Sequence, residues 1–257
     1  MKIGLIGRGA IAQYVTHALK ARGMDVAAVL LRVSAAPQAP QDYTSVAGLP
    51  GDVTLMIDCA GHAALAQHGP ALLASGRDMI SLSLGALADP ALEDALAKAA
   101  AEGQSRLHLA SGAVGALDAL SAAQAGGLDS VTYTGRKPPL GWRGSLAEKV
   151  LDLDALRTGE AVHFEGSARQ AALTYPKNAN VAAAVALAGL GFDATRVRLI
   201  ADAGITRNIH EVTASGAFGD FRFEISGNAL PGNPRSSALA AMSVLAKLDQ
   251  LRARVTL

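Results

Sequence analysis

The first twelve residues combine an apolar segment with a glycine-rich turn of the kind that binds phosphate groups. Gly7, Gly9 and Ala12 form the pattern Gly-x-Gly-x-x-Ala, directly after the apolar run of residues 3–6. The first glycine permits the tight bend, the second lets the backbone approach a pyrophosphate, and the small third residue lets the next helix pack on the strand. The pattern predicts a site for NAD or NADP; the alternative is a strand–helix turn without a ligand. The expected contacts are Gly7, Gly9, Ala10 and Ile11.

The end of the second expected strand bears on the choice between NAD and NADP. In NAD sites an acidic residue at this place binds the ribose hydroxyls, whereas an arginine often accommodates the 2′-phosphate of NADP. The strand expected over residues 25–31 ends without an acid and is followed by Arg32. Arg32 is therefore a candidate contact for the 2′-phosphate, with a solvated surface arginine as the alternative. The choice of nicotinamide stays open.

Three polar segments in the second half carry further candidates, at residues 111–115, 175–183 and 202–212. The third contains His210, and a histidine with a pKa near neutrality can accept a proton from an amine or activate a water. Asp202 or Glu211 is a candidate for orienting the imidazole, although strand alternation directs Glu211 to the opposite face. A lone histidine in a strand is more commonly structural, as the other five histidines are expected to be.

These segments, in this order behind the glycine turn, resemble the L-aspartate dehydrogenase family. The family patterns are S-G-A-x-G, matched by residues 111–115, then P-x-N-x-N-V-A-A, matched by residues 176–183, then N-x-H, matched by residues 208–210. The loops at residues 136–139 and 233–237 also resemble the family. Each motif is modest alone, but the ordered set covers nearly the whole chain.

The resemblance implies a reaction and several site residues. Members of the family oxidise L-aspartate to iminosuccinate with NAD or NADP, and the reaction is reversible. Iminosuccinate hydrolyses to oxaloacetate and ammonia, or feeds quinolinate and NAD synthesis. The family's catalytic histidine corresponds to His210, and its cofactor-contacting residues correspond to Ala113 and Asn180. Two substrate carboxylates need cationic or hydrogen-bonding partners. The candidates are Lys137, Arg169 and Ser236, with Arg136 and Ser237 behind them.

Other interpretations remain open at this level. Asn180 is also suited to cap the helix expected from Val181. Cys59 precedes His62 closely, but a structural cysteine near the cofactor is the favoured reading. Two further functions are a dehydrogenase of the same build acting on another amino or hydroxy acid, and a non-catalytic nucleotide-sensing protein. The sequence contains no spacing typical of a metal site.

The expected elements place these motifs on an α/β fold. Strands and helices alternate up to residue 110, which predicts a Rossmann-type, doubly wound parallel sheet that binds the dinucleotide. A terminal helix is expected from residue 235 and would complete this domain through residue 257. Residues 111–234 are expected to form a second α+β domain for substrate binding and dimerisation. Arg136–Pro139 is expected as a stiff loop, and residues 216–220 as a hairpin turn.

Composition limits the function classes. The chain has 257 residues, of which 50% are hydrophobic but only 4% aromatic, and a net charge of +1. There is no basic cluster that would favour nucleic acid or a membrane surface as a partner. The single cysteine, Cys59, permits no internal disulfide, and the N-terminus lacks the pattern of a signal peptide. We expect a cytoplasmic homodimer that acts on a small dicarboxylic amino acid.

Overall fold

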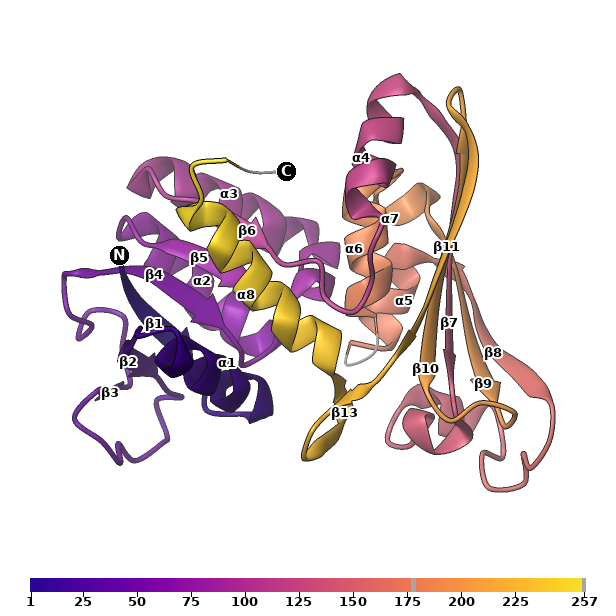
Figure 1. The fold of residues 1–257 in the computed structure, drawn as a ribbon, viewed down its shortest axis with the longest axis horizontal. Helices are drawn as coiled ribbons and strands as arrows, with labels where there is room; N and C mark the ends of the chain where they lie inside the picture. Colours follow the sequence, from indigo (N-terminus) through magenta and orange to yellow (C-terminus); the bar gives the residue numbers. More distant parts are fainter. Residues whose placement is uncertain (177–178, 256–257) are drawn as a thin grey trace. The chain divides into compact units, whose positions relative to one another are not determined.

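A computed structural model describes residues 1–176 and 179–255, with the side chains of residues 234 and 235 also left undescribed (Figure 1). The chain divides into two compact units. The first comprises Met1–Ala110 and Ala240–Leu257, and the second comprises Ser111–Leu239. Among the described residues, no helix combines the length and apolar character needed to span a bilayer.

The first unit is built on a six-stranded parallel sheet with the order β3-β2-β1-β4-β5-β6. The central strand β1 pairs with β2 on one side and β4 on the other, so the strand order reverses beside it. Its residues Ile3, Leu5 and Ile6 are buried, as expected for a strand covered on both faces. The strands are β1 (Lys2–Ile6), β2 (Val26–Leu30), β3 (Asp42–Tyr43), β4 (Val53–Asp58), β5 (Asp78–Ser81) and β6 (Leu107–Leu109).

Helices cover this sheet and share its core. Val15 and Leu19 of the first helix, and Val244 and Leu248 of the last, lie in one apolar cluster with strand residues such as Leu5. The C-terminal helix therefore belongs to the same core as the first strand. The helices are α1 (Ala10–Ala21), α2 (His62–Ala74), α3 (Pro90–Gly103) and α8 (Ala238–Arg252), with the 3-10 helix η1 (Leu84–Ala88).

The start of the terminal helix differs from the expectation. Residues 235–237 are not helical but belong to β13 (Asn233–Ser237), which pairs with β12 (Ala229–Leu230). The hairpin turns at Gly232, whose φ of +76° favours glycine. The helix begins only at Ala238, whose N–H is bonded to the carbonyl of Asn228.

The second unit is a five-stranded mixed sheet with the order β11-β10-β7-β9-β8. β7 and β9 are parallel, whereas the other neighbouring strands are antiparallel. Figure 1 shows its helices gathered on one face of this sheet. The strands are β7 (Leu128–Lys137), β8 (Glu160–Ser167), β9 (Arg196–Asp202), β10 (Asn208–Gly216) and β11 (Gly219–Gly227). The helices are α4 (Leu117–Gly126), α5 (Ala168–Thr174), α6 (Asn180–Ala188) and α7 (Gly191–Ala194).

Two elements of this unit correct the sequence-based expectations. Arg136 and Lys137 are not in a loop: they are the last residues of β7, where Arg136 pairs with Ile200 of β9. Helix α5 was not expected, although a capping box between Ser167 and Gln170 marks its start. Both corrections matter for the site, because the end of β7 carries a candidate side chain.

Candidate active site

The glycine turn of the first unit has the geometry that a dinucleotide requires. Gly7 follows β1 with a φ of +86°, and a Cβ there would lie 2.9 Å from the Cβ of Ala60. At Gly9 a Cβ would meet only the carbonyl of Cys59, at 4.0 Å. Packing within the protein therefore requires glycine at position 7 but not at position 9. The open space at Gly9, directly before α1, fits the close approach of a pyrophosphate.

An ion pair beside this turn was not anticipated from the sequence. Arg8 binds the carboxylate of Asp42, the first residue of β3, and the Asp42 side chain is fully buried. The other carboxylate oxygen accepts the N–H groups of Gln38 and Ala39 at 2.7 and 3.0 Å. Asp42 is thus engaged with protein donors at both oxygens. Arg32 is exposed, and its side chain forms no hydrogen bond or ion pair with the residues that the structure describes.

The second unit places His210 on the helix-covered face of its sheet. His210 is 6% exposed, and its Nδ1 lies 2.8 Å from the hydroxyl of Tyr133 on β7. The two rings are nearly parallel, with an interplanar angle of 19°. Gly135 is the strand partner of His210, and a Cβ there would lie 2.7 Å from the Tyr133 hydroxyl oxygen. The missing side chain at Gly135 therefore leaves room for the Tyr133–His210 bond.

Lys137 ends β7 on the same face as Tyr133 and Gly135, because strand residues alternate between faces. Its Nζ lies 4.8 Å from the ring centre of Trp142, in the 3-10 helix η2 (Pro139–Trp142). Burial lowers the pKa of Lys137 to about 8. Trp142 in turn contacts His163 edge-on, at 4.3 Å between ring centres.

The electrostatics of His210 differ from the expectation of a near-neutral pKa. Burial, and secondarily the charge of Lys137, lower the pKa of His210 to about 4. The same two causes lower the pKa of His163 to about 4. The candidates for orienting His210 were wrong as well. Asp202 forms an ion pair with Arg136 at 3.7 Å, and Glu211 forms one with Arg222 at 2.5 Å. The group that contacts the imidazole is instead the hydroxyl of Tyr133.

The remaining candidates lie elsewhere in the second unit. Ala113 is buried at 8% exposure. Asn180 is the first residue of α6 and Ala179 is its N-cap, so Asn180 does not occupy the capping position. Arg169 on α5 forms two bonds to Asp193, at 2.7 and 2.8 Å, which neutralise its charge.

Two motif segments are described only in part. Ser236 in β13 accepts a bond from the side chain of Asn233 at 3.0 Å. Lys177 and Asn178, which belong to the motif before α6, lie outside the described residues.

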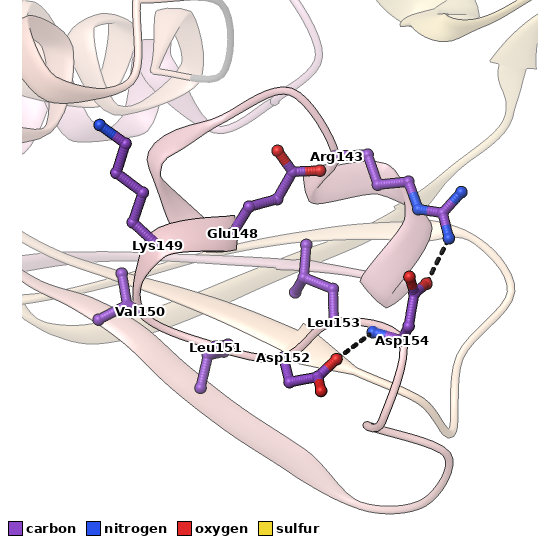
Figure 2. A pocket seen from close by; sticks show the side chains of 8 residues that line it. All are labelled: Arg143, Glu148, Lys149, Val150, Leu151, Asp152, Leu153 and Asp154. Carbon is purple, nitrogen blue, oxygen red and sulfur yellow. Dashed lines mark hydrogen bonds and ion pairs between the residues drawn. The ribbon is translucent and has the colours of Figure 1, made fainter.

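Neither described hollow contains His210. One, of about 440 Å³, lies beside the glycine turn and includes Gly7 and Arg8. The other, of about 490 Å³, is formed by residues 143–154 of the second unit. Figure 2 shows Arg143 directed at Asp154 across the rim of this second hollow, which contains no residue singled out in the sequence. Within the described part of the chain, no cluster of side chains is suited to hold a metal ion.

The parallel sheet with its glycine turn, joined to a unit with a buried histidine on a mixed sheet, defines the class of nicotinamide-dependent oxidoreductases. Comparisons with known proteins agree with this class and narrow it. Residues 7–110 match the family model of the homoserine dehydrogenase NAD-binding domain. Residues 118–251 match that of the aspartate dehydrogenase C-terminal domain.

Individual relatives identify the family. The chain is 55% identical to an L-aspartate dehydrogenase of Ruegeria pomeroyi, over 99% of this chain and 94% of the relative. It is 46% identical to an L-aspartate dehydrogenase of Ralstonia nicotianae, over 96% of each chain. The solved aspartate dehydrogenase of Thermotoga maritima is 26% identical, with a TM-score of 0.79 over 100% of this chain and 99% of that one. The chain belongs to the L-aspartate dehydrogenase family, and the resemblance inferred from the ordered motifs is confirmed.

Proposed function

We propose that this protein is an NAD(P)-dependent L-aspartate dehydrogenase that oxidises L-aspartate reversibly to iminosuccinate. Membership of the family supports the substrate. The arrangement that carries the proposal at the level of chemistry is the buried Tyr133–His210 pair on the face of the sheet that also bears Lys137. Together these side chains offer hydrogen-bond donors and an amine to an amino-acid substrate.

We infer that the first unit binds the cofactor and that the second unit binds the substrate. A bound nicotinamide would supply the acceptor for the hydride that leaves Cα of the substrate. Backbone N–H groups from Gly7 to Ile11 bind the pyrophosphate of the cofactor, and Ala113 and Asn180 are proposed as further cofactor contacts. Residues 1–110 with the terminal helix form the proposed cofactor domain, and the intervening residues form the proposed substrate and dimerisation domain.

His210 is the proposed catalytic residue, and the substrate carboxylates need partners besides it. Arg169 and Ser236 remain the proposed carboxylate ligands, together with the cationic form of Lys137. Because Arg169 is already paired with Asp193, it binds a carboxylate only if that pair opens or shares its donors. Ser236 brings a hydroxyl without such a competing charge.

Either nicotinamide fits the turn, and the surrounding charges favour acceptance of NADP. Asp42 pairs with Val29 of the second strand, and its carboxylate oxygens are held by Arg8 and two backbone N–H groups. It is therefore poorly placed to accept ribose hydroxyls. Arg32 instead supplies positive charge for a 2′-phosphate.

The test is a substrate panel with the purified protein. L-Aspartate, L-glutamate, L-alanine and L-malate are supplied at alkaline pH with NAD or NADP, and formation of the reduced nicotinamide is followed by absorbance. The proposal predicts turnover of L-aspartate well above that of the others. Turnover of another acid instead would indicate a different dehydrogenase of the same build. Cofactor binding without any turnover would indicate a nucleotide-sensing protein. Sedimentation of the same sample tests the proposed homodimer.

A further inference from the structure

The bond between Tyr133 and His210 has a direction that burial decides. Tyr133 is 1% exposed, and among the described residues its hydroxyl is hydrogen-bonded to His210 alone. If the hydroxyl accepted a proton from Nδ1, its own O–H would be left without a partner in the interior. Leaving a buried donor unpaired costs about 1–3 kcal/mol. Tyr133 therefore donates, and Nδ1 of His210 accepts.

This direction fixes the tautomer of the imidazole. A neutral histidine carries one proton, so an accepting Nδ1 leaves that proton on Nε2. A protonated ring would donate from both nitrogens and would force the unfavourable arrangement of Tyr133. Burial and the charge of Lys137 act in the same direction, since they lower the pKa of His210 to about 4. His210 is thus a hydrogen-bond donor through Nε2 and a poor proton acceptor at neutral pH.

Lys137 is the group beside His210 that is suited to accept a proton. The alternation of β7 puts it on the face of Tyr133 and Gly135, and its charge reaches both His210 on β10 and His163 on β8. Both imidazoles are neutral at physiological pH, and the aromatic ring of Trp142 lies against its Nζ.

Two acidic side chains near the end of β7 pair with Arg136. Glu160 and Asp202 pair with Arg136, whose side chain alternates to the other face of β7. Burial lowers the pKa of Lys137 to about 8, so that its neutral amine becomes available at mildly alkaline pH. An amine of that pKa is matched to an ammonium substrate near neutral and mildly alkaline pH.

We propose that Tyr133 is a positioning residue, which holds His210 as a neutral donor through its Nε2–H group. Lys137 then accepts the proton of the substrate ammonium. This inference rests on the proposed oxidation of L-aspartate. An N–H bond of the ammonium breaks and an N–H bond forms on Lys137. The Cα–H electron pair then leaves as hydride, for which the nicotinamide of the proposed function would be the acceptor. The product is the iminium, and donation from Nε2 of His210 to a substrate carboxylate oxygen holds the substrate in position. Lys137 afterwards returns its proton to water.

The tautomer is tested without any turnover. Full-length protein labelled with ¹⁵N in histidine is compared with the Tyr133→Phe variant, and His210→Gln assigns the signal. The proposal predicts that the wild-type ring carries its proton on Nε2 from pH 6 to 9. In Tyr133→Phe it predicts a mixture of tautomers and a raised pKa of His210. A wild-type ring protonated on Nδ1, or a spectrum that Tyr133→Phe leaves unchanged, would overturn the positioning role.

The proton acceptor is tested by kinetics at saturating L-aspartate and cofactor. Wild-type kcat is expected to rise with pH through a group near pH 8, which is the value to which burial lowers the pKa of Lys137. Lys137→Gln should lose this rise and about 10²-fold or more in kcat, with partial recovery when methylamine is added. Lys137→Arg keeps the positive charge but not the accepting nitrogen, so it should be equally impaired. Wild-type kcat in Lys137→Arg would show that Lys137 serves only as a cation.

The two tests separate this inference from the proposed function. If wild-type protein fails to oxidise L-aspartate, the proposed function fails, while the spectrum of His210 still reports on Tyr133. If wild-type protein is active and the Lys137 variants keep its pH profile, the function stands and the proton acceptor is wrong. Unchanged cofactor binding and circular dichroism verify that each variant is folded.

Discussion

Burial shifts three titratable side chains of the second unit toward their neutral forms. The imidazoles of His210 and His163 and the amine of Lys137 all have lowered pKa values, chiefly because burial penalises their charged forms. Such shifts cluster at functional sites because proton transfer needs groups that change charge near the working pH. In this unit the group closest to that condition is Lys137 rather than His210.

Replacement of His210 by alanine removes the buried donor and leaves Tyr133 without its partner. We expect kcat with L-aspartate to fall by about 10²-fold or more, as when one preorganised hydrogen-bond donor is removed from an active site, with little change in cofactor affinity. Steady-state kinetics and fluorescence titration of the reduced nicotinamide measure the two quantities. The matched control is His17→Ala, since His17 is exposed on α1. Full activity in His210→Ala would refute the catalytic assignment.

The preference between NAD and NADP is predicted to depend on Arg32. Arg32→Asp places a carboxylate where a 2′-phosphate is expected, so the affinity for NADP should fall about 10-fold or more relative to that for NAD, because charge-assisted contacts are lost and repulsion is gained. Dissociation constants for both cofactors give this ratio. Arg157→Asp, an equal change of charge at an exposed site in the second unit, is the control. An unchanged ratio would mean that Arg32 does not contact the ribose.

At the scale of elements, the pairing of β7 with β10 assembles the candidate site. Antiparallel register sets His210 opposite Gly135 and Glu211 opposite Thr134, so a shift of one residue would turn His210 to the other face. The terminal helix α8 has a comparable role in the first unit, where Val244 and Leu248 complete the core around β1. Each site thus depends on segments that are distant along the chain.

Gly135→Ala tests the pairing of β7 with β10. The added Cβ would lie 2.7 Å from the hydroxyl oxygen of Tyr133 and 3.3 Å from Leu199. We expect a loss of about 1–3 kcal/mol in the free energy of unfolding, as for other overpacked cores, and a fall in kcat as Tyr133 shifts. Urea denaturation and kinetics measure both. In the control Gly126→Ala, the added Cβ meets no atom within 4 Å, so both values should stay near wild type.

At the scale of the whole molecule, the chain combines one unit for the dinucleotide with one whose core contains titratable groups. The first sheet is wholly parallel, and its buried strands are almost entirely apolar. The second is mixed and buries His163 and His210 among aromatic rings. The first unit also buries Asp58 and His68, but among the histidines the pKa values of His163 and His210 are lowered furthest, so stability should respond to pH largely through the second unit.

Acidification should destabilise the fold between about pH 6.5 and 4. The pKa values of His163 and His210 are lowered from 6.5 to about 4 in the folded chain, so the unfolded chain binds more protons in this window. Stability is then complete above pH 6.5 and declines as pH falls, by at most about 3 kcal/mol per histidine. Denaturation midpoints from pH 4 to 7 measure the slope. The double variant His163→Gln/His210→Gln should show a shallower slope, and an equal slope would contradict the prediction.

The sequence alone determined the features that short segments encode. The strand, turn and helix start around Gly7 and Gly9 follow from backbone requirements of neighbouring residues, and the alternation up to residue 110 correctly predicted the parallel sheet. The ordered motifs were sufficient for the family. In contrast, the end of β7 was misjudged because Pro138 and Pro139 suggested a loop that starts two residues later than expected.

Only the tertiary structure decided which side chains meet. Tyr133 and His210 are 77 residues apart, and Arg8 and Asp42 are 34 residues apart. No local pattern reports such contacts, because they arise from the register of paired strands and the packing of whole elements. The lowered pKa values have the same origin, since burial is a property of the folded chain. The sequence thus identified His210, while the fold supplied Tyr133 and Lys137 and, with them, the protonation states on which the chemistry depends.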